Sequence, residues 1–320
     1  MPGRLSRTNT IILLWGLDTD SPIIAVRDAL LRLNLPFVHL EQRDALSTTV
    51  ELSIGGPVPV TGFVRCRNQM IDLASITACY LRPDDSRALE DVAAAGETSL
   101  AWNHALRVED ALLCWAEITS TFVVSPPSAM SSNSSKPYQL ELIRAHGMAV
   151  PETLITTDPA AVLAFNAEHG AIIYKSISGV RSKVSRFRAE HFERLENLSS
   201  CPTQFQQFIS GIDYRVHVVG DQVFAARIVS NADDYRYATD SEQGDLEVVP
   251  CEIPSRLAES CMNIASGMGL PVAGLDLRRT VNDCWYCFEV NPSPGFTFYD
   301  RLPEEPIATA IARLLARVSK

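Results

Sequence analysis

Two acidic residues and an asparagine near the C-terminus have the types and spacing of a magnesium site. The segment AGLDLRRTVNDCWYCFEVN reads as two strands, and Asn282-Asp283 suits a two-residue hairpin turn because both residues tolerate positive φ. With that turn, Asp276 faces Glu289 across the hairpin, and Asn291 follows two residues later on the same face. Opposed carboxylates repel each other, whereas Mg²⁺ is held by one or two carboxylates together with substrate phosphates. These three side chains are therefore the candidate metal ligands.

The same hairpin separates polar from apolar side chains. Arg278 is predicted on the polar face, opposite Cys287, where it is available to a phosphate. The apolar face would consist of Leu275, Leu277, Tyr286, Phe288 and Val290. Taken alone, the pattern fits equally well an ordinary amphipathic hairpin with a solvated acidic face.

The composition is that of a folded, acidic protein. Of its 320 residues 46% are hydrophobic, which is enough for a large core and about two domains, or three small ones. No apolar run approaches the roughly 20 residues of a membrane helix, and the polar N-terminus leads into a strand too short for a signal-peptide core. A net charge of -10 argues against nucleic-acid binding. We expect a cytoplasmic protein without nucleic-acid or membrane partners, and leave a homo-oligomer open.

Cysteine and histidine patterns do not indicate a catalytic or zinc site. Cys284 and Cys287 form a CxxC, but a separation of three within a strand places the thiols on opposite faces, and no second CxxC or His pair completes a zinc site. His104, His146 and His217 lie in separate segments and are expected to be structural.

The order of the elements predicts an α/β (α+β) protein. Residues 11–16 read as a strand, Ser21 as the N-cap of a helix with Pro22 at its first position, and 36–42 as a strand. This β-α-β order is typical of a parallel, Rossmann-like sheet, although no G-x-G-x-x-G follows the first strand. The polar stretch 128–137 reads as a linker, a small α/β module follows it, and the pattern becomes strand-rich from Thr203. The predicted domains are 1–127, 128–202 and 203–320.

From residue 128 onward, several motifs occur in the order found in the ATP-grasp superfamily. They are SKPYQLELIRAHGMAVPETLIT, IIYKSISGVRS, FQQFISGIDYRVHVVG and the hairpin described above. The chain resembles in particular the branch of ribosomal-protein glutamate ligases and peptide-modifying, microviridin-type ligases, and its N-terminal part resembles the pre-ATP-grasp domain more loosely. The resemblance implies an ATP-grasp fold with ATP between the small α/β module and the C-terminal domain. It also implies two Mg²⁺ ions, with Mn²⁺ as the alternative, on Asp276, Glu289 and Asn291.

The resemblance also assigns residues to the nucleotide. Lys136 and Lys175 are expected at the phosphates, Asp213 at the ribose, and the backbone of Gln207 and Phe208 at the adenine edge, with Ile209 as a further candidate. A lysine that ends an apolar strand beside a Ser/Gly loop is hard to explain by packing, whereas Lys136 alone could be an ordinary loop lysine. The full candidate set is Lys136, Lys175, Ser178, Gly179, Arg181, Ser182, Gln207, Phe208, Ile209 and Asp213.

Four arginines are candidates for the transferring phosphoryl group, because arginine makes forked contacts with phosphate. They are Arg215, Arg227, Arg236 and Arg278. For Arg227 and Arg236, an exposed surface position is the alternative interpretation. The glutamate-ligase branch typically has Arg-Ser-Asn where this chain has Arg236-Tyr237-Ala238, a departure that argues against a glutamate-adding activity.

The resemblance implies an ATP-dependent ligase that activates a carboxylate as an acyl phosphate and joins it to an amine, releasing ADP and phosphate. A macrocyclising maturase of a ribosomal peptide and a non-catalytic ATP-binding sensor are the alternatives. Arg82, in YLRPDDSR, resembles an arginine-bearing turn of the peptide-modifying branch. The basic strip of Arg181, Lys183, Arg186 and Arg188 would suit an acidic peptide, or would simply be a solvated face.

Overall fold

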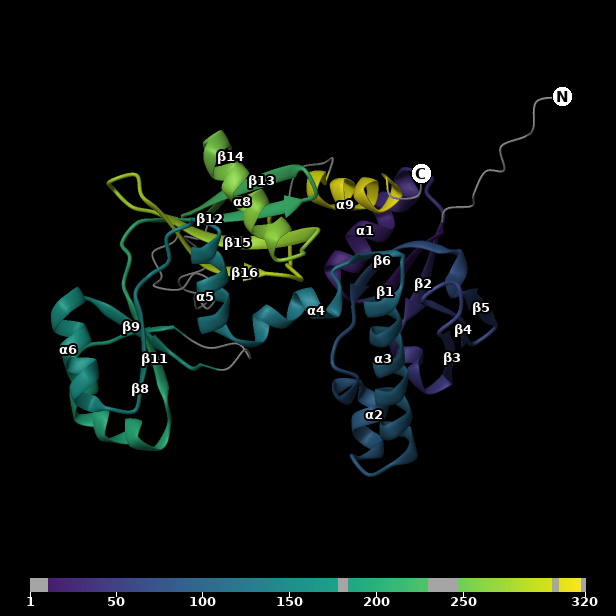
Figure 1. Cartoon of the computed structure of the whole chain (residues 1–320), viewed down its shortest axis with the longest axis horizontal. Coiled ribbons are helices and arrows are strands. Elements are labelled where there is room, and N and C mark those ends of the chain that lie inside the picture. The colour runs from purple at the N-terminus through teal and green to yellow at the C-terminus, as the bar shows by residue number, and fades with distance from the viewer. Residues whose placement is uncertain (1–10, 178–183, 230–246, 301–304, 318–320) are drawn as a thin grey trace. The chain divides into compact units, whose positions relative to one another are not determined.

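The computed structural model of the chain describes residues 11–177, 184–229, 247–300 and 305–317 (Figure 1). The chain is divided into two compact units, each with most of its contacts within itself. The first contains the N-terminal part up to Met130, Leu270–Val272 and the segment from Gly295 onward, and the second contains Ser131–Gly269 and Ala273–Pro294. The C-terminal segment thus groups with the N-terminal unit, and the predicted division into three domains stays a prediction.

A parallel sheet forms the centre of the first unit, as the β-α-β order predicts. Its strand order is β2-β1-β6-β7, with all three pairings parallel. The strands are β1 (Ile11–Gly16), β2 (Phe37–Glu41), β6 (Ile76–Arg82) and β7 (Phe122–Val124). The side chains of Leu13, Cys79 and Leu81 are almost completely buried in the core of this unit, which is typical of a parallel sheet covered on both faces.

The longer helices of the first unit bury apolar stripes. The helices of this unit are α1 (Ser21–Arg32), α2 (Glu90–Ala95), α3 (Leu100–Ile118), α4 (Pro127–Met130) and α9 (Pro306–Arg317), with short 3-10 segments η1 (Gln42–Ser47), η2 (Leu73–Ser75) and η3 (Ser86–Ala88). In α3 the buried residues Ala105, Val108, Leu112 and Trp115 recur every three or four positions, as an amphipathic helix requires. Helix α9 packs against α1 and β6. No helix in the described part of the chain is long and apolar enough to cross a membrane.

A three-stranded antiparallel sheet also belongs to the first unit and does not feature among the predicted elements. It consists of β3 (Thr48–Ile54), β4 (Val60–Cys66) and β5 (Gln69–Asp72). Burial alternates strictly along β4, which is the pattern of a sheet with one face on the core. The alternation includes Gly62 in the buried set, and a glycine weakens a strand pattern.

The second unit contains two sheets. The smaller one has the order β10-β9-β11-β8 and carries α6 and the 3-10 segment η5 on one face. Its elements are β8 (Thr153–Thr156), α6 (Pro159–His169), β9 (Ile172–Lys175), β10 (Ser185–Arg186), η5 (Ala189–Ser200) and β11 (Thr203–Gln207). This part corresponds to the predicted small α/β module with two differences: β11 belongs to it although it is predicted in the C-terminal domain, and α5, predicted in the module, packs on β16 of the larger sheet.

The larger sheet has the order β14-β13-β12-β15-β16, with antiparallel pairing in each register that is defined. Its strands are β12 (Ile212–Val219), β13 (Gln222–Val229), β14 (Glu247–Cys251), β15 (Val272–Arg279) and β16 (Trp285–Asn291), and the helices of this part are η4 (Ser131–Ser134), α5 (Lys136–Ala145) and α8 (Ser255–Gly267). Helix α5 packs on β16 and α8 on β12. Val216, Leu275 and Val290 are completely buried and leave the alternate positions of these strands for polar side chains.

Two local predictions are corrected. The stretch 128–137 is not a linker without structure, because it contains parts of α4, η4 and the start of α5, where Ser135 caps the helix through the N–H of Tyr138. The N-cap of α1 is Asp20 rather than Ser21. A serine-rich sequence is compatible with both a loop and a succession of helix starts, since serine favours N-cap positions.

Asp300 stabilises the start of α9 from outside the helix. Its two carboxylate oxygens accept the N–H groups of Ile307 at 3.0 Å and Ala308 at 2.9 Å. We expect Asp300→Ala to lower the free energy of unfolding by about 1–2 kcal/mol, the usual value for a lost cap. Burial raises the pKa of the Asp300 carboxyl, so the folded state binds the proton more tightly. The contribution of this group to stability therefore falls as pH rises through the interval just above the usual aspartate pKa.

Urea denaturation at several pH values checks both expectations, with Asp110→Ala on the exposed side of α3 as the control. Equal stability of Asp300→Ala and the control variant would contradict the assigned role of Asp300.

Candidate active site

Charged side chains gather on one face of the larger sheet, on its neighbouring strands β12 and β15. Asp213 and Arg215 alternate with buried apolar residues on β12, and Asp276 and Arg278 do so on β15. Each strand contributes one acid and one arginine, two residues apart, and the two strands pair these charges crosswise. The structure thus brings four of the predicted site residues together.

The Arg215–Asp276 ion pair is the more deeply buried of the two. Arg215 Nη1 donates to Asp276 Oδ1 at 2.7 Å, and the side chains are only 8% and 18% exposed. Arg215 Nε lies 3.4 Å from His217 Nε2. Because a guanidinium can only donate, His217 Nε2 is the acceptor and the proton of a neutral imidazole is on Nδ1. The guanidinium is therefore held from two sides.

Gly274 provides the space for this guanidinium. A Cβ at Gly274 would lie 2.3 Å from Arg215 Nη2, 2.8 Å from its Cζ and 2.7 Å from the Cβ of Pro294. All of these distances are far below van der Waals contact. Any other residue at 274 would push Arg215 away from Asp276, so glycine is required here by close approach rather than by its backbone angles.

The predicted metal ligands lie on paired strands in the predicted register. Asp276 faces Glu289 and Gly274 faces Asn291 in the β15–β16 ladder. Asn291 Oδ1 also accepts the N–H of Ser293 at 2.9 Å, which fixes the orientation of the amide. No group of three or more His, Cys, Asp or Glu side chains that could hold a metal occurs among the described residues. Two carboxylates and one amide fit Mg²⁺, which completes its shell with water and phosphate oxygens, and do not fit a structural zinc site.

The register changes immediately beyond Asp276, and this corrects part of the prediction. An irregularity between Asp276 and Leu277 sets Arg278 opposite Tyr286 rather than Cys287. At the other end, Thr280 N–H donates to Cys284 O and Asp283 has a φ of 65°. That geometry is a three-residue loop with a left-handed last residue, in place of the two-residue turn expected from the sequence.

The bulge also exchanges the side chains that face the core. Cys287 is completely buried, and burial raises its pKa well above the usual thiol value. Tyr286 and Phe288, predicted in the core, are only partly buried, and Phe288 lies beneath Arg278, with 5.1 Å from the guanidinium carbon to the ring centroid. Cys284 is exposed and Cys287 buried, but Cys284 precedes β16, so the expectation of opposite faces within one strand stays a prediction.

Sequence reasoning missed Gln139, a buried residue of α5. Its Nε2 donates to Val290 O at 2.7 Å and its Oε1 accepts the N–H of Val290 at 3.0 Å. Val290 lies between Glu289 and Asn291 on β16, the edge strand of the sheet, whose outer backbone groups need partners. The side-chain amide therefore replaces a neighbouring strand and fixes the segment that carries two predicted ligands.

Lys136 is positioned by the same helix. It is the first residue of α5, one turn before Gln139, and residues three apart on a helix are neighbours. A cation at a helix N-terminus is disfavoured by the helix dipole, so helix stability does not explain it. Helix α5, which Lys136 begins, packs on the strand that carries Glu289 and Asn291, and the phosphate contact of Lys136 stays a prediction.

Arg278 holds the predicted adenine and ribose segment rather than a phosphate position. Its Nε and Nη2 donate to the two carboxylate oxygens of Asp213 at 2.7 and 2.8 Å, and its Nη1 donates to Ile209 O at 2.8 Å. Bidentate pairing of this kind is geometrically specific. Arg278 thus joins β15 to the segment between β11 and β12.

The backbone of that segment is already partly engaged. The N–H of Gln207 donates to Glu152 O, and the N–H of Phe208 donates to Ala171 O, both at 2.9 Å. These two donors are therefore occupied within the protein. The predicted reading of adenine is left to the carbonyl groups of the segment and to the backbone of Ile209.

One predicted arginine lies on the other face of the sheet, and five predicted site residues lie outside the described part of the chain. Arg227 is exposed and pairs with Tyr214 on β12, so it points to the opposite face of the sheet from Arg215. Ser178, Gly179, Arg181, Ser182 and Arg236 lie outside the described residues. Lys175, at the end of β9, donates to Gln206 Oε1 at 3.4 Å.

Comparison with known proteins decides the family. Residues 133–315 match the RimK-like ATP-grasp domain, which is more than half of the chain. The chain belongs to the RimK-like ATP-grasp family. The predicted fold class is thereby confirmed, and the family is one of ATP-dependent ligases.

Relatives and solved structures agree with this assignment. A probable alpha-L-glutamate ligase of Rhodopirellula baltica is 28% identical over 61% of this chain and 50% of its own length, and one of Shewanella loihica is 25% identical over 64% and 70%. The chain therefore spans only half of the first of these relatives. The ATP-grasp ligase PsnB, solved with a minimal precursor variant, Mg and ADP, superposes with a TM-score of 0.77 at 29% identity, covering 97% and 99% of the two chains. The macrocyclase MdnC of Microcystis aeruginosa, at 22% identity, a TM-score of 0.80 and coverage of 96% and 100%, shares the fold.

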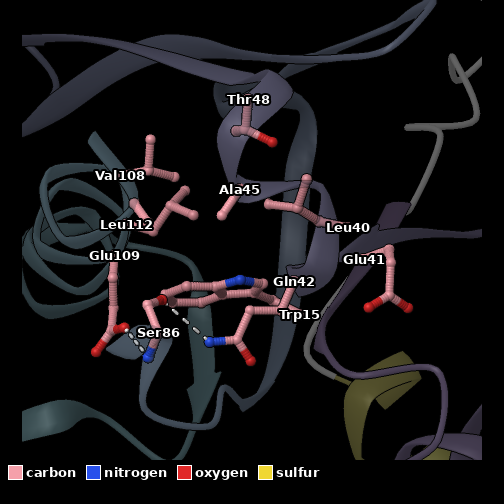
Figure 2. Close-up of a pocket in the computed structure, with 11 residues that line it drawn as sticks. Trp15, Leu40, Glu41, Gln42, Ala45, Thr48, Ser86, Val108, Glu109 and Leu112 are labelled. Atoms are coloured by element: carbon pink, nitrogen blue, oxygen red, sulfur yellow. Dashed lines mark hydrogen bonds between the residues drawn. The ribbon is translucent and has the colours of Figure 1, made fainter. Parts of the chain in front are cut away.

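In the first unit, polar side chains hold Arg82 at the end of β6 and the turn that follows it. Arg82 Nε donates to Asp20 Oδ2 at 2.5 Å. The amide of Gln42 donates to Asp84 O at 2.6 Å and accepts the N–H of Asp84 at 2.8 Å. Figure 2 shows Gln42 and a glutamate of α3 around Ser86, beside a cavity of about 10 Å³. This volume admits at most one water and is too small for a substrate.

Replacing Gly274 tests whether the Arg215–Asp276 geometry matters for ATP chemistry. We expect Gly274→Ala to lower the ATP turnover number about 10²-fold, because a misplaced buried charge costs about 3 kcal/mol of transition-state stabilisation. Gly295→Ala is the matched control, since a Cβ at Gly295 meets no atom within 4 Å.

A double-mutant cycle with Arg215→Lys separates this effect from general damage. If Gly274→Ala acts through Arg215, the double variant is no slower than the slower single variant. Multiplying losses in the double variant would contradict the assigned role of Gly274.

Proposed function

We propose that this RimK-like protein is a carboxylate–amine ligase that uses Mg-ATP to form an acyl phosphate. The observation that carries the proposal is the set of oxygen ligands Asp276, Glu289 and Asn291 in one register, beside the buried guanidinium of Arg215. A carboxylate is a poor electrophile, and phosphorylation by ATP gives it a good leaving group. Catalysis then consists mainly of positioning and charge neutralisation around the phosphoryl group.

Named residues take distinct roles in this proposal. Asp276, Glu289 and Asn291 would hold two Mg²⁺ ions, which would supply positive charge to neutralise the phosphates. Arg215, pinned by Asp276 and His217, presents a fixed positive charge to the transferring group, where preorganised charges have their largest effect. Arg278 fixes Asp213 and the carbonyl of Ile209 at the ribose and adenine. Lys136 and Lys175 contact the phosphates.

The second candidate is a ligase that joins two groups within one peptide. It is favoured by the larger share of this chain that peptide-modifying ligases match. The glutamate-ligase relatives of Rhodopirellula and Shewanella align with 61% and 64% of this chain. PsnB and MdnC, solved with precursor peptides, superpose on 97% and 96% of it, and so extend over the first unit. The eight cysteines are all free, which fits a reducing compartment, and we place the enzyme in the cytoplasm.

Product analysis tests the proposed reaction. We expect ATP to be converted to ADP and phosphate, at a rate that rises when a suitable carboxylate substrate is added, because the acyl-phosphate route attacks the γ-phosphorus. Chromatography measures the nucleotide products, and mass spectrometry measures the change in mass of candidate substrates. A peptide that gains a glutamate residue indicates the first candidate, and one that loses water indicates the second. Formation of AMP and pyrophosphate would rule out the proposal.

A further inference from the structure

Gln204 is a fully buried residue whose polar atoms are unused. It lies on β11 with 0% exposure, and neither its amide nitrogen nor its amide oxygen has a hydrogen-bond partner in the described structure. Buried side-chain amides are almost always bonded, because an unpaired buried group keeps the cost of its desolvation. The unpartnered amide therefore destabilises the ligand-free protein and needs an explanation.

Its neighbour Gln206 shows what a satisfied amide looks like at the same site. Gln206 has the same side-chain direction, two residues along β11, and is 1% exposed. Its Nε2 donates to Thr153 Oγ1 at 3.0 Å, and its Oε1 accepts from Lys175 Nζ at 3.4 Å. Of the two glutamines on this face of β11, Gln206 is therefore hydrogen-bonded within the protein and Gln204 is not.

The position of Gln204 indicates which ligand it meets. It is the cross-strand partner of Lys175 on β9, so the two side chains share a face, while Phe205 points to the core on the other face. Along β11, Gln207 is the nearest of the residues predicted at the adenine and lies three residues away, about 10 Å at the usual rise of a strand. Gln204 is therefore too far from the segment proposed for adenine to contact the base, and lies beside the cation proposed for the phosphates.

We propose that Gln204 is a phosphate-binding residue of the nucleotide site, an inference that rests on the proposed function of that site. The side chain is 0% exposed without a ligand, so the proposal requires that it becomes accessible when the nucleotide binds, and its Nε2 then donates a hydrogen bond to a phosphate oxygen of Mg-ATP. Its Oε1 accepts from Lys175, whose ammonium has three donors and is within cross-strand reach. A neutral amide adds a donor next to Lys175 without the repulsion that another cation would introduce. Both polar ends are then satisfied in the complex, whereas neither has a partner in the described structure.

Substitution by methionine distinguishes a ligand contact from a structural one. Gln204→Met keeps the length of the side chain and removes both polar groups. The thermal midpoint without nucleotide should rise by a few degrees, because the unpaired amide is gone. The Kd for Mg-ATP, measured by calorimetry, should increase about 10-fold, as expected for one hydrogen bond to a charged group. The Kd for adenosine, which has no phosphate, should not change.

Matched variants keep the result interpretable. Gln206→Met should lower the midpoint without nucleotide, because it breaks two existing bonds. Gln204→Leu repeats the test if the methionine variant does not fold. An unchanged Kd for Mg-ATP, an equal loss of adenosine binding, or a lower midpoint in both Gln204 variants would each overturn the inference. Lys175→Met separates this outcome from failure of the proposed site. Weaker Mg-ATP binding by Lys175→Met with normal binding by the Gln204 variants overturns only the role of Gln204, whereas no binding by the unaltered protein overturns both.

Discussion

The ion pair between Arg215 and Asp276 is the interaction on which the polar face of the larger sheet depends. Two opposite charges with side chains 8% and 18% exposed are tolerated only when their geometry is good, because each has lost most of its hydration. That requirement explains the glycine at 274, whose missing side chain leaves room for the guanidinium. It also explains the buried imidazole of His217, which accepts from the other side of Arg215. Removal of Arg215 or Asp276 alone would leave the other buried charge without its partner.

A second, reversed pair on the same two strands extends this arrangement towards the smaller sheet. Arg278 on β15 holds Asp213 on β12 and the carbonyl of Ile209, so the segment that enters β12 is bound to the strand that carries Asp276. Beyond this segment, β11 presents Gln204 and Gln206 next to Lys175. On the other side, Gln139 ties helix α5 to the backbone between Glu289 and Asn291. The proposed metal, phosphate, ribose and adenine positions are thus linked by short side-chain contacts within one unit.

Much of this arrangement follows from the sequence because it rests on strand periodicity and pairing. The opposition of Asp276 and Glu289 depends only on a hairpin of nearly correct register, and it is confirmed. The register nearer the turn is not predicted correctly, because a three-residue loop and a bulge compensate each other. The two irregularities restore the pairing at Asp276 but move Arg278 opposite Tyr286. A bulge has no reliable pattern in residue types, so this difference could not have been read from the letters.

Other features escape sequence reasoning because they are made by contacts between distant segments. Gln139 and Val290 are 151 positions apart, and a glutamine in an amphipathic helix has no property that marks it as a partner for a strand edge. The same holds for Gly274, whose role is defined by a guanidinium on another strand. The position of Arg227, in contrast, follows from strand alternation. Once the pairing of β12 and β13 is known, alternation places Arg227 on the face of the sheet away from Arg215.

The central claim is that Asp276 and Glu289 together hold a divalent cation when a nucleotide is bound. Electron paramagnetic resonance of Mn²⁺, titrated into the protein with ADP, tests it without any knowledge of the carboxylate substrate. The account predicts that Glu289→Gln weakens Mn²⁺ binding at least 10-fold, since the loss of one of two carboxylates removes a full ligand charge, while Glu259→Gln on the exposed side of α8 has no effect. Equal Mn²⁺ affinity in Glu289→Gln and the unaltered protein would contradict it.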